Sequence, residues 1–228
     1  MQSAVGVSDM TWKIPIFTKT PAHAPSLTRE EPDSLGLTES DYIAAATTIG
    51  CEVAAIRAVA EVESAGRGFL PDGRPAILYE AHVFHRLTGG KYARERDRYG
   101  VPLSVPKWDR TLYGKPGAHQ YERLEDAMKL DETNACFACS WGTYQIMGFN
   151  FASLGFPHID TFREFMESNN SPRKHLDMFV RFIMVHGLDD ELREKNWAAF
   201  ARQYNGPQYA ANKYDIKMRD AYERFRGA

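Results

Sequence analysis

Helical patterns follow one another along most of this chain, and they restrict its fold more than any other feature of the sequence. From residue 38 onward, apolar side chains recur at helical spacing in short segments that stop at glycine, proline or charged turns. The predicted helices cover residues 38–50, 52–64, 82–87, 121–129, 132–139, 149–154, 160–167, 171–186, 189–194, 197–204 and 209–225. The run 75–80 is typical of an extended segment, so we predict a mainly α fold with at most a small β element near Ile77–Tyr79.

Two capping sequences mark the clearest helix boundaries. Thr38 with Asp41 resembles an N-terminal cap, and Gly50 stops that helix. Ser171 followed by Pro172 is a strong start signal, because proline suits the first turn of a helix.

The first 34 residues differ from the rest of the chain. Pro15, Pro21, Pro25 and Pro32 interrupt a stretch that has no helical period. We therefore expect residues 1–34 to form a tail or linker and residues 35–228 to form one domain.

The charge balance restricts the partners of the protein. Its 28 lysines and arginines face 30 aspartates and glutamates, a net charge of -2. Nucleic-acid binding draws on clustered positive charge, so we expect no nucleic-acid partner. No apolar stretch approaches the roughly 20 residues of a bilayer span, so we expect no membrane insertion. We also expect a monomer. The first 17 residues lack the basic start and apolar core of a secretory signal.

Three cysteines, Cys51, Cys136 and Cys139, are too few for a disulfide-stapled scaffold. Cys136 and Cys139 have the C-x-x-C spacing of a metal half-site or redox pair, and His82 with His85 would be the nearest second pair for zinc. Structural zinc sites usually show their second pair close to the first, so we favour small buried thiols and expect neither metal nor cofactor.

Glu63 is an acid on an apolar helix face. It stands seven residues after Ile56 and four after Val59, so the three side chains share one side of the predicted helix. Desolvation raises the pKa of such a carboxyl, which can then donate a proton near neutral pH. A half-exposed acid at a helix end is the structural alternative, and Glu61 would replace Glu63 if the helix had a different register.

Glu80 is a second acid in an apolar setting, directly after the extended run and before a helical turn. It either caps that turn through the backbone around Val83 or projects into a cleft. Two carboxyl groups with different pKa values are what cleavage of a glycosidic bond requires, so the pair is more informative than either acid alone.

Two further segments carry polar and aromatic side chains. Between Ser140 and Gly148, Gln145 can both donate and accept hydrogen bonds, as acetamido sugars require, and Trp141 either stacks on a sugar or fills the core. Tyr204 and Asn205 end a predicted helix at Gly206, where they form either a binding surface or an ordinary helix end.

Together these motifs resemble the lysozyme superfamily, in the order found in goose-type lysozymes and lytic transglycosylases. The closer resemblance is to the N-acetylmuramidase family of phage endolysins and some bacterial wall-lytic effectors. The motifs that carry it are Val62-Glu63-Ser64-x-Gly66, Leu78-Tyr79-Glu80-x-His82-x-Phe84, Ala138-x-Ser140-Trp141-Gly142-x-x-Gln145-Ile146-Met147-Gly148 and Tyr204-Asn205-Gly206. The resemblance covers residues 37–225.

The resemblance implies a lysozyme-like, two-lobed α domain that cleaves peptidoglycan between N-acetylmuramic acid and N-acetylglucosamine. It implies that Glu63 is the general acid and Glu80 the second catalytic carboxylate. The candidate substrate-binding residues are Ser140, Trp141, Gln145, Tyr204 and Asn205. His82 and His85 are close enough in sequence to Glu80 to tune it, although histidines satisfied within the structure are commoner.

Three other functions stay open on the sequence. A lytic transglycosylase would use Glu63 without a second carboxylate, and a chitinase-like hydrolase would act on a related glycan. A wall-binding module with a degenerate cleft would not catalyse at all.

A phage endolysin fits the motifs best, and a bacterial toxin delivered to the periplasm is the alternative. We expect the protein to stay in the host cytoplasm until a holin or another export factor releases it to the periplasm. Because the charge is near neutral, we also expect lysis of permeabilised cells and little effect on intact Gram-negative cells, unless Arg219, Arg224 and Arg226 form a basic patch.

Overall fold

A computed structural model describes residues 30–64, 68–168, 171–206 and 209–227. The helices and strands of these described residues belong to one compact unit, Glu31–Ala228. This unit starts before the predicted boundary at residue 35, because the Asp33 carboxylate accepts hydrogen bonds from the Leu35 and Leu37 amides and from the Tyr42 hydroxyl. Of the tail or linker predicted for residues 1–34, residues 1–29 lie outside the described residues.

Helices make up most of the described structure, as the sequence predicts. The α-helices are α1 Glu39–Ile49, α2 Val53–Glu63, α3 Ala81–Leu87, α4 Ala118–Phe137, α5 Ile159–Glu167, α6 Pro172–Val185, α7 Asp189–Glu194, α8 Trp197–Asn205 and α9 Tyr214–Arg226. Short 3-10 turns are η1 Arg110–Leu112, η2 Gly148–Asn150 and η4 Tyr209–Asn212.

A small antiparallel sheet has the strand order β1-β2-β3, with β1 Ile77–Tyr79, β2 Cys139–Trp141 and β3 Ile146–Met147. Leu78 pairs with Ser140, and Trp141 pairs with Ile146, so β2 and β3 enclose a four-residue hairpin loop, 142–145. The β element predicted at β1 is confirmed, and it is larger than predicted because β2 and β3 pair with it.

The two predicted caps are confirmed. The Thr38 hydroxyl accepts from the Asp41 amide, Asp41 accepts from the Thr38 amide at 2.9 Å, and Gly50 ends α1 in the left-handed conformation with φ +78°. The Ser171 hydroxyl accepts from the Lys174 amide at the start of α6.

Four predicted helices need correction. The segments 121–129 and 132–139 form one helix, α4, kinked at Asp131, and Cys139 lies in β2 instead of the helix. Residues 149–154 form only the end of η2 and turns. The predicted helix 209–225 is η4 followed by α9, because Lys213 interrupts it with φ +54°.

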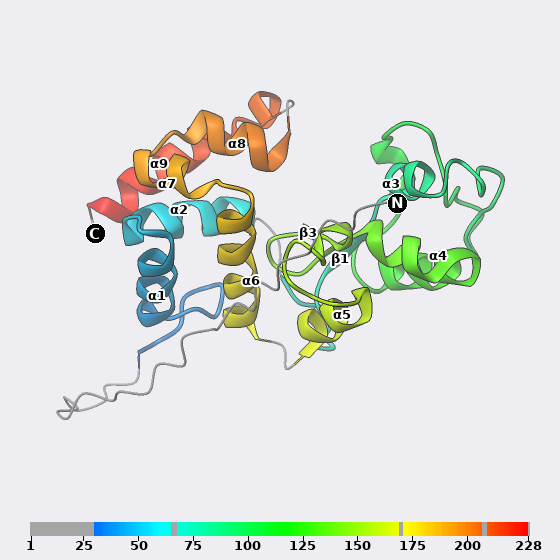
Figure 1. Ribbon diagram of the computed structural model, residues 1–228, viewed down its shortest axis with the longest axis horizontal. Helices are drawn as coiled ribbons and strands as arrows, with labels where there is room; N and C mark the ends of the chain where they lie inside the picture. The colour runs from blue at the N-terminus through cyan, green and yellow to red at the C-terminus, as the bar shows by residue number, and fades with distance from the viewer. Residues whose placement is uncertain (1–29, 65–67, 169–170, 207–208, 228) are drawn as a thin grey trace, which may run out of the picture. The chain divides into compact units, whose positions relative to one another are not determined.

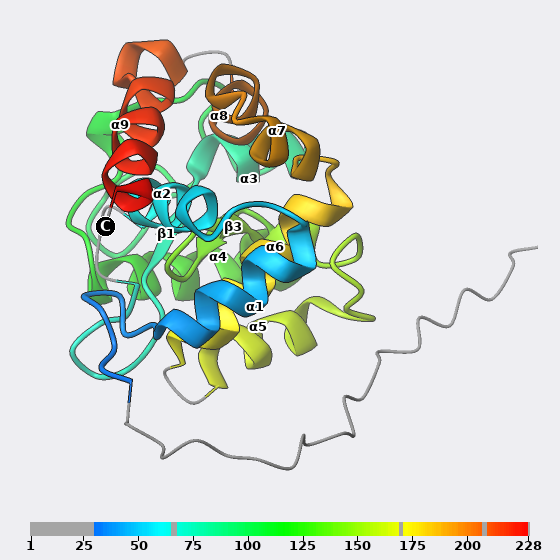
Figure 2. The same cartoon turned by 90° about the vertical axis from the view of Figure 1, so that its left-hand side faces the viewer.

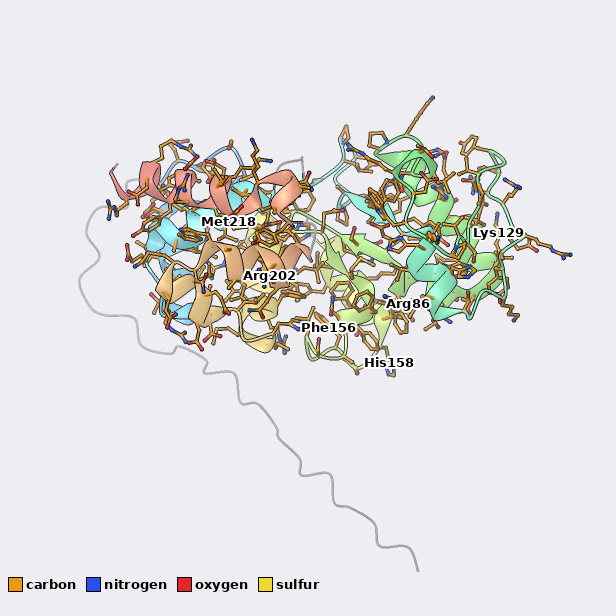
Figure 3. All side chains as sticks on the ribbon, turned by 90° about the horizontal axis from the view of Figure 1, so that it is seen from above. Arg86, Lys129, Phe156, His158, Arg202 and Met218 are labelled. Carbon is orange, nitrogen blue, oxygen red and sulfur yellow. The ribbon has the colours of Figure 1, made fainter. Side chains whose placement is uncertain are left out.

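The elements form two groups, which Figure 1 shows on either side of α6 and the sheet. In the first group α2 packs against α1, α7 and α9, and α1 packs against α6; Figure 2 shows α1 beside α6 from another side. In the second group α4 packs against β1, β2 and α3. Figure 3 places Met218 and Arg202 on the first group and Arg86 and Lys129 on the second.

Within the described ranges, no single helix is both long and apolar enough to cross a membrane. The pair α1 and α2, bent by 107°, meets the same length and composition test when taken together.

Candidate active site

Glu63 is the last residue of α2, on the side that faces the core of the first group. The residues it follows along this face, Ile56, Val59 and Ala60, are completely buried. Burial raises the pKa of Glu63 from 4.5 to about 7, although a hydrogen bond from Asn205 and the nearby charge of Lys217 both act to lower it. Glu63 therefore keeps its proton to a higher pH than an exposed glutamate does.

Asn205 is the residue that contacts this carboxyl. Its side-chain Nδ2 donates to Glu63 Oε1 at 2.9 Å. Because Asn205 ends α8 and Glu63 ends α2, two helices that both pack against α9 meet at their C-terminal ends.

Tyr204, the neighbour of Asn205, is tied into the core. Its hydroxyl donates to the Tyr144 carbonyl at 2.6 Å, and its ring stacks on Phe200 and packs edge-on against Phe179 and Phe182. The Tyr204 hydroxyl therefore donates its hydrogen bond within the protein. This bond fixes the end of α8 that carries Asn205.

Glu80 follows β1 and occupies the N-cap position of α3 without a side-chain capping bond. The capping alternative is therefore wrong, and the carboxyl, 14% exposed, has other partners. The Tyr113 hydroxyl donates to Oε2 at 2.7 Å, and Nδ1 of His82 lies 3.2 Å from the same oxygen. Burial raises the pKa of Glu80, and the Tyr113 hydrogen bond opposes that rise.

The two histidines of this segment differ in their contacts. Burial and the charge of Arg86 lower the pKa of His82, so it meets Glu80 as a neutral ring at neutral pH. Nδ1 of His85 instead lies 2.9 Å from the Ser104 hydroxyl, and no contact joins it to Glu80 in the described structure.

Tyr113 is a site residue that the sequence did not indicate. It follows η1 in the irregular connection between α3 and α4, where no periodic pattern marks a side chain that points inward. Gln120 of α4 donates to the Tyr113 carbonyl at 2.7 Å and to the Lys115 carbonyl at 2.8 Å, and it accepts from the Tyr79 amide at 3.2 Å. One side chain therefore joins the strand before Glu80 to the segment that carries Tyr113.

Arg123 of α4 also binds the backbone of the connection between α3 and α4. It is fully buried, donates to the Leu112 and Pro102 carbonyls and forms an ion pair with the fully buried Asp97, Nε to Oδ2 3.0 Å. Hydrogen bonds to other groups support this buried ion pair: both Nη atoms of Arg123 donate to backbone carbonyls. Asp97 Oδ1 in turn accepts from the Tyr99 and Val101 amides.

The hairpin residues of the predicted binding set bond mainly to one another. Ser140 donates to Gln145 Oε1 at 2.8 Å, and Gln145 Nε2 donates to the Gly142 carbonyl at 2.8 Å. Gln145 adopts a left-handed backbone, φ +48°, at the exposed end of the loop. Trp141 is completely buried and packs edge-on against Phe162, which favours the core residue of the two alternatives considered for it.

Gly68 and Phe69 lie directly against this hairpin and the helix beside it. A Cβ on Gly68 would come within 2.9 Å of the Thr143 backbone, so only glycine fits there. His175 of α6 completes the contact: its Nδ1 accepts from the Thr143 amide at 3.2 Å, and its ring stacks on Phe69.

Glu61, the alternative to Glu63, is exposed and forms an ion pair with Arg224 at 2.8 Å. It also lines a cavity of about 340 Å³ with Tyr42, Arg57 and Phe225. Glu61 therefore has a solvated, paired carboxylate, whereas Glu63 has a carboxyl of raised pKa.

Cys136 and Cys139 are both buried and unbridged. Burial raises the pKa of both thiols, and Cys136 accepts from Arg163 Nη1 at 3.6 Å. The described residues contain no group of three or more His, Cys, Asp or Glu side chains that could hold a metal ion.

Two comparisons identify the family. The N-acetylmuramidase family model matches residues 52–226. The crystal structure of the Burkholderia AP3 phage endolysin matches with a TM-score of 0.74 and 40% identity, over 86% of this chain and 74% of that one. No curated protein matches the chain.

The fold and these matches define a glycoside hydrolase of the lysozyme type. The chain belongs to the N-acetylmuramidase family, and its activity is the cleavage of peptidoglycan.

Proposed function

We propose that the protein hydrolyses the β-1,4 bond between N-acetylmuramic acid and N-acetylglucosamine, with Glu63 as general acid and Glu80 as second carboxylate. The observation that carries this proposal is the position of the Glu63 carboxyl at the end of a buried apolar helix face, where Asn205 binds it and burial raises its pKa to about 7. A carboxyl of this kind keeps its proton at the pH at which ordinary glutamates are ionised.

Glu63 would transfer this proton to the glycosidic oxygen as the bond breaks. The departing sugar then leaves as an alcohol, which avoids expelling an unstable alkoxide. The hydrogen bond from Asn205 to Oε1 holds the carboxyl in one orientation and leaves Oε2 to carry the proton.

Glu80 would act from the second group of elements. The Tyr113 hydroxyl donates to it, which favours the ionised form. An ionised Glu80 activates a water molecule or stabilises the positive charge that develops on the sugar. Both tasks lie within the chemistry of carboxyl groups, so the proposal requires no cofactor.

The remaining candidate residues support the site in different ways. We propose that Ser140 and Gln145 shape the hairpin edge on which the glycan lies, since they bond to each other and Gln145 is exposed. Asn205 orients the acid, and Tyr204 fixes Asn205 through its bond to the Tyr144 carbonyl.

The test is product analysis of purified peptidoglycan digested by the native protein and by the Glu63→Gln, Glu80→Gln and Glu61→Gln variants. We expect new reducing N-acetylmuramic acid ends with the native protein and with Glu61→Gln, and a loss of at least a hundredfold with the other two. Products with 1,6-anhydro ends would indicate transglycosylation instead. Full activity of the Glu63→Gln variant would exclude Glu63 as the general acid.

The similarity to a phage endolysin supports a role in host lysis. We propose that the protein is a monomer without membrane insertion, made in the host cytoplasm and released to the periplasm by a holin or another export factor. Expression in a bacterial host should cause lysis only when a holin is produced with it, and lysis without one would contradict this route.

A further inference from the structure

Trp108 is a large exposed aromatic residue next to the second carboxylate. Its side chain belongs to the connection between α3 and α4, and the residue is 59% exposed. The indole Nε1 donates to the Tyr113 hydroxyl at 2.6 Å, and that hydroxyl donates in turn to Glu80 Oε2 at 2.7 Å. A single hydroxyl group therefore separates the indole from the carboxylate.

The orientation of this indole is fixed although its ring is open to solvent. The N–H bond and the edge-on packing of the Tyr113 ring, with centroids 6.4 Å apart, hold one edge of the indole. Tryptophan offers a large apolar surface with only two side-chain torsions, so little conformational entropy is lost when a held ring binds a ligand.

The segment beneath Trp108 is anchored as well. Arg123 binds the Leu112 carbonyl, Gln120 binds the Tyr113 carbonyl, and the Asp109 carboxylate accepts from the Thr111 amide and hydroxyl. Both the ring and its backbone support are therefore in place before any ligand arrives.

We propose that the exposed face of Trp108 is a subsite that stacks on a pyranose ring of the glycan strand beside Glu80. The C–H faces of a pyranose are apolar, and an open aromatic ring is their natural partner. This inference rests on the proposed function, because it takes the glycan to pass Glu80. Tyr113 then links an occupied subsite to the carboxylate through its two hydrogen bonds.

The experiment measures binding without turnover. The Glu63→Gln variant is titrated calorimetrically with a peptidoglycan tetrasaccharide of two N-acetylglucosamine–N-acetylmuramic acid units, and the same titration is repeated with added substitutions. Trp108→Ala should weaken binding about tenfold, whereas Trp108→Phe, which keeps an aromatic face, should weaken it less than about threefold.

The matched control is Tyr99→Ala. Tyr99 is 55% exposed on the same connection, and its hydroxyl binds Glu122 instead of Glu80, so we expect unchanged binding. Melting temperatures of all variants check that the fold is kept. Native-like affinity of a folded Trp108→Ala variant, or equal weakening by Trp108→Phe, would overturn the subsite.

The same set of variants distinguishes a failure of this inference from a failure of the proposed function. In the otherwise native enzyme, Trp108→Ala should raise KM about tenfold and change kcat little. Retained lysis by Glu63→Gln would overturn the proposed acid, while the KM comparison would still decide the role of Trp108.

Discussion

Asn205 Nδ2 lies 2.9 Å from Glu63 Oε1, although 142 residues separate the two along the chain. The bond joins the C-terminal ends of α8 and α2. It favours the ionised carboxylate, so it opposes the rise in pKa that burial causes.

Removing this bond should change the pH profile of activity. In Asn205→Ala the pKa of Glu63 should rise above 7, because a group that favours the ionised form is lost. The alkaline limb of the profile of kcat/KM should therefore move to higher pH. Initial rates from pH 4 to 9 would measure this, with Gln203→Ala on the exposed side of α8 as control. An alkaline limb that stays in place or moves down would contradict the role of Asn205.

The raised pKa also has a cost in stability. The folded protein binds the Glu63 proton with a pKa of about 7 and the unfolded chain with one of 4.5, so stability falls as the pH rises between these values. Glu63→Gln removes this cost and should stabilise the fold by at most about 3 kcal/mol at pH 8, with no gain near pH 4. Urea unfolding at the two pH values tests this, and an equal effect at both would refute it.

Tyr113→Phe should move the acidic limb of activity. The substitution removes the hydroxyl that favours ionised Glu80, so the pKa of Glu80 should rise and the acidic limb should shift to higher pH. Tyr99→Phe removes a hydroxyl that donates to Glu122 at 2.7 Å and serves as the matched control. A uniform loss of rate with an unchanged acidic limb would argue against this function of the hydroxyl.

Breaking the buried pair Arg123 and Asp97 should destabilise the fold strongly. Arg123→Met leaves the buried charge of Asp97 without its cationic partner, with only the amides of Tyr99 and Val101 still donating to it, at a cost of about 3 kcal/mol or more. Urea denaturation measures it, and Arg98→Met, which removes an exposed partner of Asp126, should cost far less. A loss below about 1 kcal/mol for Arg123→Met would show that the connection is held in other ways.

Added from outside, the protein should lyse permeabilised Gram-negative cells and leave intact ones largely unaffected. Arg219, Arg224 and Arg226 each form an ion pair with an acid, namely Asp220, Glu61 and Glu223. Arginines that are already paired with acids compete poorly with divalent ions for the anionic groups of an outer membrane. Turbidity assays with and without a permeabilising agent would test this, and rapid clearing of untreated cells would disprove it.

The sequence could single out the two candidate carboxyl groups because both differ from their neighbours. Glu63 ends an apolar helix face, and Glu80 ends an apolar run, so each breaks a local pattern. Tyr113 could not be found in this way, since it lies in an irregular connection whose conformation is set by distant α4 side chains, Gln120 and Arg123.

The strand β2 was missed for a related reason. Its three residues are all buried, so they show no alternation between apolar and polar side chains, and a short run of this kind cannot be told from a helix end. Lys213 interrupts the last predicted helix in a left-handed conformation that lysine seldom adopts, so nothing in the local sequence indicates the break.

The close contact of Gly68 with Thr143 limits which residues position 68 can accept. Any side chain at position 68 would push the backbone there away from the hairpin, and the stack of Phe69 on His175 would open with it. In a saturation library, position 68 should therefore be among the least tolerant of the chain, although its residue touches neither carboxyl group. Such intolerance would result from the close approach of two backbone segments, since glycine has no side chain that could take part in the reaction.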